Sequence, residues 1–227
     1  MSHVCNTCPV RDSAACAVLS KAERDQLAKA GRTRTLERGE MLFAAGDETA
    51  ACATLVSGAL KVANYDENGN ERILALIHPA GFVGELFEPF PSHHVVALTN
   101  STLCVFARQD MNRALARHPE LTRALLRRSQ EDLHSARELL SLGSGHSAVE
   151  QVGSLVISLA SAASSSPCHP EFRFDSPLTR GEMASMLGLT IETVSRALSA
   201  LEKAGAIRRH GSRGIELLDP ACLENAV

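Results

Sequence analysis

Residues 178–196, LTRGEMASMLGLTIETVSR, decide the fold of the C-terminal part of the chain. Thr179 and Glu182 have the spacing of a capping box, so a short helix is predicted to begin there. Gly188 ends that helix, and Thr190 can cap a second helix directly after it. The stretch therefore predicts two short helices separated by a tight glycine turn.

The second helix is predicted to continue to about Ala204, with Gly205 at its end. Its apolar residues recur with helical spacing and should form one buried stripe: Ile191, Val194, Leu198 and Leu201. The opposite face is polar: Glu192, Ser195, Arg196 and Ser199. Apolar residues on both sides of 211–214 then predict a β-hairpin. Two helices around a turn, followed by a hairpin, indicate a winged helix-turn-helix.

The polar face of the second helix suits the major groove of DNA, which admits one helix. Arg196 can donate two hydrogen bonds to guanine, Glu192 can accept one from cytosine, and Ser195 can bond a base or a phosphate. Taken alone, these side chains are also compatible with an ordinary solvated helix face. Other basic residues suit phosphates, which position a protein without specifying sequence: Arg180, Lys203, Arg208, Arg209 and Arg213. The succession of helix, turn, helix and basic hairpin favours DNA binding.

Upstream, from about residue 36 to residue 107, short apolar runs alternate with turn signals. Asn68-Gly69 lies between two runs rich in β-forming residues and is typical of a hairpin turn. Turns that recur about every 8–12 residues predict a sandwich or barrel-like β domain.

Between Glu120 and Leu142 the sequence has neither Gly nor Pro, which predicts one long helix that begins at His118-Pro119. Leucines recur in it every seven residues with small residues between them: Leu126, Ser129, Leu133, Ala136 and Leu140. This pattern indicates a seam that pairs with another helix, although a helix packed on its own domain would show the same stripe. Residues 143–145 read as a hinge, 149–162 as another helix and 164–167 as a loop.

The composition limits the classes of protein. The chain has 227 residues, 44% hydrophobic, with a net charge of −3, which suits two folded domains. No apolar run reaches the ~18 residues that span a membrane, and the first residues lack the features of a secretory signal. The sequence has no G-x-S-x-G, Walker or H-E-x-x-H motif, so no enzyme is indicated. A cytoplasmic protein without a membrane partner is expected.

Seven cysteines in a chain without an export signal indicate reduced thiols or metal ligands rather than disulfides. Cys5, Cys8 and Cys16 lie in a segment with too few aliphatic residues for a core, so they are candidates for one soft metal centre. The fourth ligand has to come from elsewhere, and the candidates are Cys52, Cys104, Cys168 and Cys222. Burial in the core is the default expectation for Cys52, Cys168 and Cys222. Zinc and an iron–sulfur cluster both accept four thiolates, so the spacing leaves the metal open.

Residues 178–183 and 187–196 resemble the DNA-reading motif of the CRP/FNR superfamily of bacterial transcription factors, and the resemblance extends over nearly the whole chain. It implies an α+β protein with an N-terminal β-roll of the cyclic-nucleotide-binding jelly-roll type, a long dimerisation helix and a C-terminal winged helix-turn-helix. The expected division is a cysteine-rich segment, a β-roll, a dimerisation helix and a DNA-binding domain, at residues 1–20, 21–110, 111–143 and 144–227.

The spacing Glu192-x-x-Ser195-Arg196 is similar to that of the oxygen-responsive FNR branch. This similarity implies a homodimer that activates transcription at TTGAT-type palindromes, with RNA polymerase as a partner. It also implies that Glu192, Ser195 and Arg196 are the base readers. The expected DNA-contacting set is completed by Thr190, Arg180 and Arg213.

The cysteines resemble those of the same branch. The four ligands of its oxygen-labile [4Fe–4S] cluster are matched by Cys5, Cys8, Cys16 and Cys104, so Cys104 is the implied fourth ligand. In that branch oxygen converts the cluster to [2Fe–2S], the dimer weakens and DNA is released. A zinc-stabilised or thiol-redox regulator of the same fold is the alternative.

One segment departs from the nucleotide-binding members of the superfamily. Those proteins follow Gly-Glu with an Arg-Ser pair that holds the cyclic phosphate, whereas here Gly84-Glu85 is followed by no Arg before Arg108. No bound cyclic nucleotide is therefore expected, and a cyclic-nucleotide-binding regulator is a second alternative. His93 and His94 are not expected to hold metal or haem, because neighbours on a strand point to opposite faces.

Overall fold

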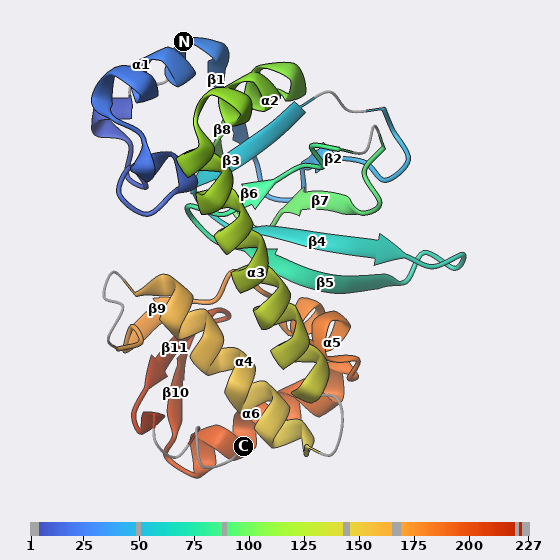
Figure 1. Ribbon diagram of the computed structural model, residues 1–227. Helices are drawn as coiled ribbons and strands as arrows, with labels where there is room; N and C mark the ends of the chain where they lie inside the picture. The colour runs from blue at the N-terminus through green and yellow to red at the C-terminus, as the bar shows by residue number, and fades with distance from the viewer. Residues whose placement is uncertain are drawn as a thin grey trace. The chain divides into compact units, whose positions relative to one another are not determined.

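The computed structural model describes residues 5–48, 51–87, 90–142, 146–164, 169–220 and 223 (Figure 1). It divides into two compact units, one of residues up to 69 with 74–135, and one of residues 70–73 with those from 136 onward. The predicted hinge at 143–145, most of the loop at 164–167, and both Cys168 and Cys222 lie outside the described residues. No helix in the described ranges is long and apolar enough to cross a membrane.

The cysteine-rich end of the chain folds into short helices. Two 3-10 turns, η1 (Cys5–Thr7) and η2 (Ala15–Val18), precede helix α1 (Lys21–Ala30). A capping box starts α1, because Ser20 Oγ accepts a hydrogen bond from the Glu23 N–H while the Glu23 carboxylate accepts one from the Ser20 N–H. The range 21–110, predicted as β-roll, thus begins with a helix that the sequence pattern does not predict.

The β-roll is confirmed as two four-stranded sheets, with strand orders β1-β8-β3-β6 and β2-β7-β4-β5 (Figure 1). The strands are β1 (Gly31–Leu36), β2 (Met41–Phe43), β3 (Ala51–Ser57), β4 (Leu60–Tyr65), β5 (Glu71–Ile77), β6 (Phe82–Val83), β7 (His94–Ala97) and β8 (Ser101–Ala107). The turn at Asn68-Gly69 is confirmed between β4 and β5. There Gly69 has a φ of +78° and its N–H donates to the Asp66 carbonyl at 2.9 Å.

Strand β8 contributes to two apolar clusters. Leu103 and Val105 pack in the core between the two sheets, where they meet residues such as Leu55. Cys104 and Phe106 point the other way, into a second cluster that also contains residues of η2, α2 and α3. Successive side chains on a strand point to opposite faces, so the register of β8 assigns alternate residues to different interiors.

Helices α2 (Arg108–Arg117) and α3 (Pro119–Leu142) follow the roll. His118 separates them, and Pro119 occupies the first position of α3, as predicted. The segment 111–143 therefore holds the end of α2 and all of α3. Leu126 and Leu133 of α3 are 62% and 50% exposed, so this face is not covered by the helix's own domain, which favours a pairing seam. The side chain of Leu140 is outside the described residues.

The second unit confirms the winged helix-turn-helix. Its elements are α4 (Ala148–Ala163), β9 (Arg173–Asp175), α5 (Arg180–Leu187), α6 (Ile191–Lys203), β10 (Ile207–His210) and β11 (Gly214–Leu217). The strands form one sheet in the order β10-β11-β9. Gly188 caps α5 in the left-handed conformation, with a φ of +68°, and Thr190 caps α6.

The buried stripe of α6 differs from the prediction at its first residue. Val194, Leu198 and Leu201 are buried as predicted, and Ala197 joins them. Ile191 is 53% exposed, so its assignment to the buried stripe is wrong. Ile191 is the first residue of α6 and lies at the end of the helix. Its Cδ1 atom lies near Gly181 of α5.

Candidate functional sites: a thiol pocket and an exposed helix

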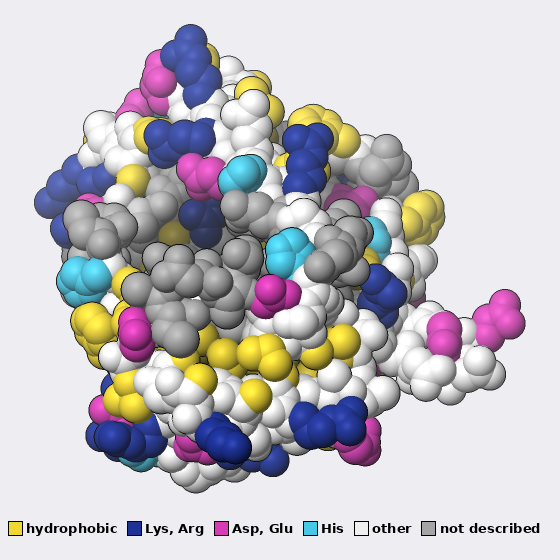
Figure 2. All heavy atoms as spheres, turned by 90° about the horizontal axis from the view of Figure 1, so that it is seen from below, with side chains coloured by type: hydrophobic (Ala, Val, Ile, Leu, Met, Phe, Trp, Pro, Cys, Tyr) yellow, Lys and Arg dark blue, Asp and Glu magenta, His cyan; other side chains and the backbone are white. Residues whose placement is uncertain are grey.

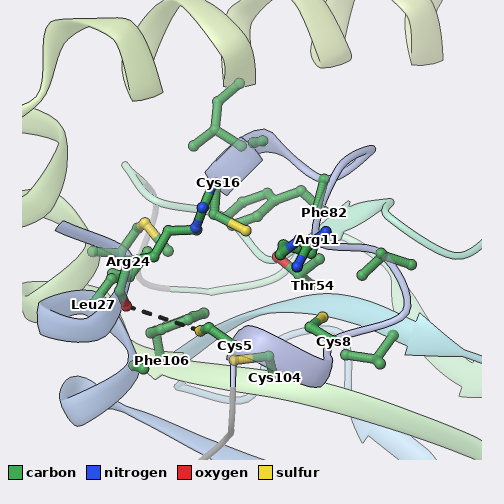
Figure 3. Close-up of a pocket in the computed structure, with 17 residues that line it drawn as sticks. Cys5, Cys8, Arg11, Cys16, Arg24, Leu27, Thr54, Phe82, Cys104 and Phe106 are labelled. Carbon is green, nitrogen blue, oxygen red and sulfur yellow. Dashed lines mark hydrogen bonds between the residues drawn. The ribbon is translucent and has the colours of Figure 1, made fainter. Parts of the chain in front are cut away.

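Four thiols line one pocket of the first unit. Cys5 comes from η1, Cys8 follows it, Cys16 comes from η2 and Cys104 from β8. Figure 3 shows these sulfur atoms around a common space, with the Cys5 thiol directed at the Arg24 carbonyl 3.9 Å away. The structure therefore brings together all four predicted ligands, from segments about 90 residues apart in the chain.

The rest of the pocket is mostly apolar. Besides the thiols it is lined by Thr54, Arg11, Arg24 and a set of apolar residues: Val10, Ala14, Ala15, Leu27, Ala28, Val56, Phe82, Phe106, Met111 and Leu125. Among the described residues, no His, Asp or Glu lines it. A donor set of sulfur alone in an apolar pocket suits a soft, sulfur-binding metal centre.

Burial favours the protonated form of three of these thiols, Cys5, Cys16 and Cys104. Burial first, and then the neighbouring cysteines, raise the pKa of Cys16 to about 11 and that of Cys104 to about 12. The pKa of Cys5 is raised by the same two causes, against a smaller lowering effect of Arg24. Metal binding at this pocket therefore has to displace protons from the sulfur atoms.

A single zinc ion and an iron–sulfur cluster both accept four thiolates, but at different spacings of the sulfur atoms. A single tetrahedral zinc ion, with Zn–S bonds of ~2.3 Å, needs its sulfur atoms about 3.8 Å apart. Among the described residues, no three His, Cys, Asp or Glu side chains are close enough to hold one ion. A polynuclear cluster binds its thiolates through different iron atoms, so its ligands stand further apart.

Gly31 allows a close approach beside Cys104. A Cβ atom at Gly31 would lie 2.7 Å from Cε1 of Phe106 and 3.3 Å from Sγ of Cys104. Strand β1 pairs with β8 at this position, Gly31 opposite Phe106, so the missing side chain lets the ring and the sulfur occupy the space above β1. The sequence alone does not reveal this role, because the contact depends on strand register.

Cys52 lies outside the pocket. It is fully buried in β3, does not line the pocket, and burial raises its pKa to about 12. A Cβ atom at Gly84 would lie only 2.8 Å from its Cα, so backbone packs directly against it. These contacts agree with the expectation that Cys52 belongs to the core.

Two side chains at the ends of the β6–β7 connection, Glu85 and His94, make contacts within the roll. Oε1 of Glu85 accepts a hydrogen bond from the Ser92 N–H at 2.9 Å. Nδ1 of His94 accepts one from the Ala45 N–H at 3.3 Å, and its ring packs edge-on against Tyr65. Both side chains thus have structural roles in the roll.

The second candidate site is the polar face of α6. Glu192 and Arg196 are exposed and Ser195 is half-buried, on the side of the helix away from Val194 and Leu198. Arg196 donates a hydrogen bond through Nη2 to Oγ1 of Thr193 at 3.2 Å. The three predicted base readers therefore share one accessible face, as a helix in a groove requires.

Some of the basic residues of this domain form ion pairs within the protein. Arg209 donates to the Glu202 carboxylate at 2.6 Å and 2.9 Å, and Glu216 pairs with both Arg208 at 3.3 Å and His210 at 2.7 Å. Among the described residues no carboxylate pairs with the remaining three cations: Arg180, Lys203 and Arg213. On the face seen in Figure 2, Lys and Arg side chains lie in separate groups, several beside Asp or Glu.

Comparison with known proteins gives matches to two sequence profiles. The profile of the Crp-like helix-turn-helix domain matches residues 121–226, and that of the cyclic nucleotide-binding domain matches residues 33–118. Together they cover most of the chain.

Full-length relatives are also found. A "Probable transcriptional activator" of Rhizobium leguminosarum bv. viciae is 34% identical over 98% of this chain and 92% of its own length. The transcriptional activator protein FnrL of Cereibacter sphaeroides is 32% identical over 97% of this chain and 90% of its own. Among solved structures, FixK2 of Bradyrhizobium japonicum shares the fold with a TM-score of 0.78, at 22% identity, over 86% of this chain and 96% of that protein.

Proposed function

The chain belongs to the CRP/FNR family of transcription regulators, and on that basis we propose that it is an oxygen-responsive activator. In this proposal it binds TTGAT-type palindromes as a homodimer in the cytoplasm while its four cysteines hold a [4Fe–4S] cluster. RNA polymerase is the partner that an activator at a promoter requires. The observation that carries the sensing part is the convergence of Cys104 with three N-terminal thiols in one apolar pocket.

The reading of DNA follows from the exposed face of α6. Inserted in a major groove, Arg196 donates to the O6 and N7 atoms of guanine, Glu192 accepts from a cytosine amino group, and Ser195 contacts a neighbouring base or phosphate. Thr190 caps α6, Arg180 begins α5 and Arg213 lies between β10 and β11; in this proposal all three bind the DNA backbone, which sets the register. A two-fold operator calls for a two-fold protein, and the exposed leucines of α3 supply the pairing surface.

The coupling of sensor to dimer follows from what α3 touches. Leu125 of α3 lines the thiol pocket, and Leu121 packs in the same cluster as Cys16 and Cys104. An iron–sulfur cluster, when bound, supplies a centre that reacts with oxygen. The protein holds the sulfur atoms against the first turns of α3, so a change in their spacing biases the packing of that helix and hence the dimer.

Anaerobic purification tests the sensing part. The protein should be brown, contain about four iron and four sulfide per chain, and bleach in air as its affinity for a palindromic TTGAT duplex falls. Cys104→Ser should lose the iron, whereas Cys52→Ser, a cysteine of the neighbouring core, should keep it. Colourless anaerobic protein that contains zinc and binds DNA equally well in air would instead establish the zinc or thiol-redox alternative.

The match to the cyclic nucleotide-binding profile raises the other alternative. Against it, Glu85 is engaged by the Ser92 N–H, no Arg lies between residues 86 and 107, and the interior of the roll is filled by apolar side chains. Titration calorimetry with cyclic AMP and cyclic GMP should give no binding heat. Micromolar binding of either nucleotide would favour the alternative.

A further inference from the structure

Three side chains form a chain of hydrogen bonds along the first two turns of α6. Nη2 of Arg196 donates to Oγ1 of Thr193 at 3.2 Å. Oγ1 of Thr193 lies 2.9 Å from Oγ1 of Thr190, and the Thr193 N–H donates to the same Thr190 oxygen at 3.2 Å. Residues three apart on a helix are neighbours on its surface, so the chain runs along one edge of the exposed face.

This arrangement restrains a side chain that is otherwise mobile. Arg196 is exposed and has several rotatable bonds, whereas Thr193 is β-branched and has few rotamers in a helix. Thr193 is half-buried and its hydroxyl is fixed by the helix cap at Thr190. The guanidinium of Arg196 is thereby held at a defined point before any DNA is bound.

The hydrogens and lone pairs of the three side chains allow all of these contacts at once. Arginine can only donate, and each threonine hydroxyl has one hydrogen and two acceptor positions. One hydroxyl hydrogen closes the contact between Thr190 and Thr193. Either hydroxyl can be the donor in that contact, and in both cases the Thr193 oxygen keeps a lone pair that accepts from Arg196.

We propose that Thr193 is a specificity-determining positioning residue, which orients Arg196 for guanine. The inference rests on the proposed DNA binding. Without the Thr193 hydroxyl, the guanidinium can turn to phosphates or to other bases, so recognition of the guanine weakens relative to other sequences.

Two substitutions separate the hydroxyl from the rest of the side chain. Thr193→Val keeps the shape and the β-branch, and Thr193→Ser keeps the hydroxyl. Fluorescence anisotropy on the full-length, anaerobically purified proteins at equal iron content would compare three duplexes: the TTGAT palindrome, the same duplex with the guanine pair of each half-site changed to adenine–thymine, and an unrelated sequence. Arg196→Ala serves as the reference for complete loss of guanine reading.

Thr193→Val should lower the preference for the guanine duplex over the adenine duplex by about tenfold, and change binding to the unrelated duplex less than about twofold. Thr193→Ser should keep the wild-type preference within about twofold. Equal losses on all three duplexes would mean that Thr193 itself contacts phosphate, and an unchanged preference would mean that Arg196 orients without it. Either result overturns the inference, as does Thr193→Ser behaving like Thr193→Val. If the wild-type protein fails to prefer the palindrome, the DNA-site proposal itself is wrong.

Discussion

Nδ1 of His118 lies 3.2 Å from Oε1 of Glu23. Glu23 uses its other carboxylate oxygen to accept from the Ser20 N–H, in the capping box that starts α1 just after the cysteine-bearing turn η2. His118 is the residue between α2 and α3. One carboxylate therefore joins the cysteine-rich segment to the base of the helix that carries the exposed leucines.

This pair gives the first prediction. The hydrogen bonds from Ser20, and then the contact with His118, lower the pKa of Glu23. A lowered folded pKa means that the stabilisation is complete above the carboxyl's ordinary range and is lost as the pH falls through its folded value. His118→Gln should therefore lower the melting temperature at pH 7 and have little effect at about pH 3. Ser20→Ala is the matched control, because it removes the Oγ acceptor of the helix cap and leaves the contact between His118 and Glu23 in place. An equal effect of His118→Gln at both pH values would contradict the prediction.

The second prediction concerns His78, at the turn after β5. Burial lowers its pKa to about 4, with a smaller contribution from Arg128. In the unfolded chain the imidazole binds a proton near pH 6.5, so the unfolded state gains protons first as the pH falls. The free energy of unfolding should decrease between about pH 6.5 and pH 4, by up to about 3 kcal/mol. Urea unfolding of His78→Gln should show a flatter pH dependence in this window, and an unchanged slope would contradict the assignment.

The third prediction concerns the close approach at Gly31. A methyl group there overlaps the ring of Phe106 at 2.7 Å and touches the Cys104 sulfur, so Gly31→Ala should destabilise the roll by about 1–3 kcal/mol. Iron retained after anaerobic purification should fall as well. Phe106→Leu in the same chain makes room for the methyl group and should restore part of the stability. Full stability of Gly31→Ala alone would mean that β1 moves away from β8 at little cost.

The fourth prediction separates structural from DNA-contacting arginines. Arg209 is held by Glu202, so Arg209→Ala should weaken DNA binding without changing the slope of log affinity against log salt. Arg213→Ala and Arg180→Ala should each reduce that slope by about one, because each removes a phosphate contact. Glu202→Gln should reproduce the effect of Arg209→Ala. A slope reduced by Arg209→Ala would place that side chain on the phosphate backbone.

The winged helix could be predicted from the sequence because its boundaries are set by local chemistry. Thr179, Glu182 and Gly188 act within a few residues of their own positions, so their spacing is enough to place the helices. Ile191 departs from the prediction because helical periodicity gives the direction of a side chain and not the end of the surface that covers it.

Helix α1 carries a readable start signal, Ser20 and Glu23, but only one large apolar residue, Leu27. Its hydrophobic pattern is too weak to predict a helix, and its packing comes from residues distant in the chain. The thiol pocket could likewise be predicted only in part. Three of its cysteines could be grouped by their spacing in the sequence. The place of Cys104 depends on the register of β8, which no local pattern determines. The pairing of Arg209 with Glu202 is likewise a tertiary contact.

The alternation of β8 has a consequence for how such proteins diversify. Its odd-numbered positions, Leu103 and Val105, pack in the apolar core between the two sheets, while Cys104 and Phe106 line the thiol pocket. A single strand thus borders two different interiors. Substitutions at every second position of this strand can therefore alter the thiol pocket and leave the core between the sheets as it was.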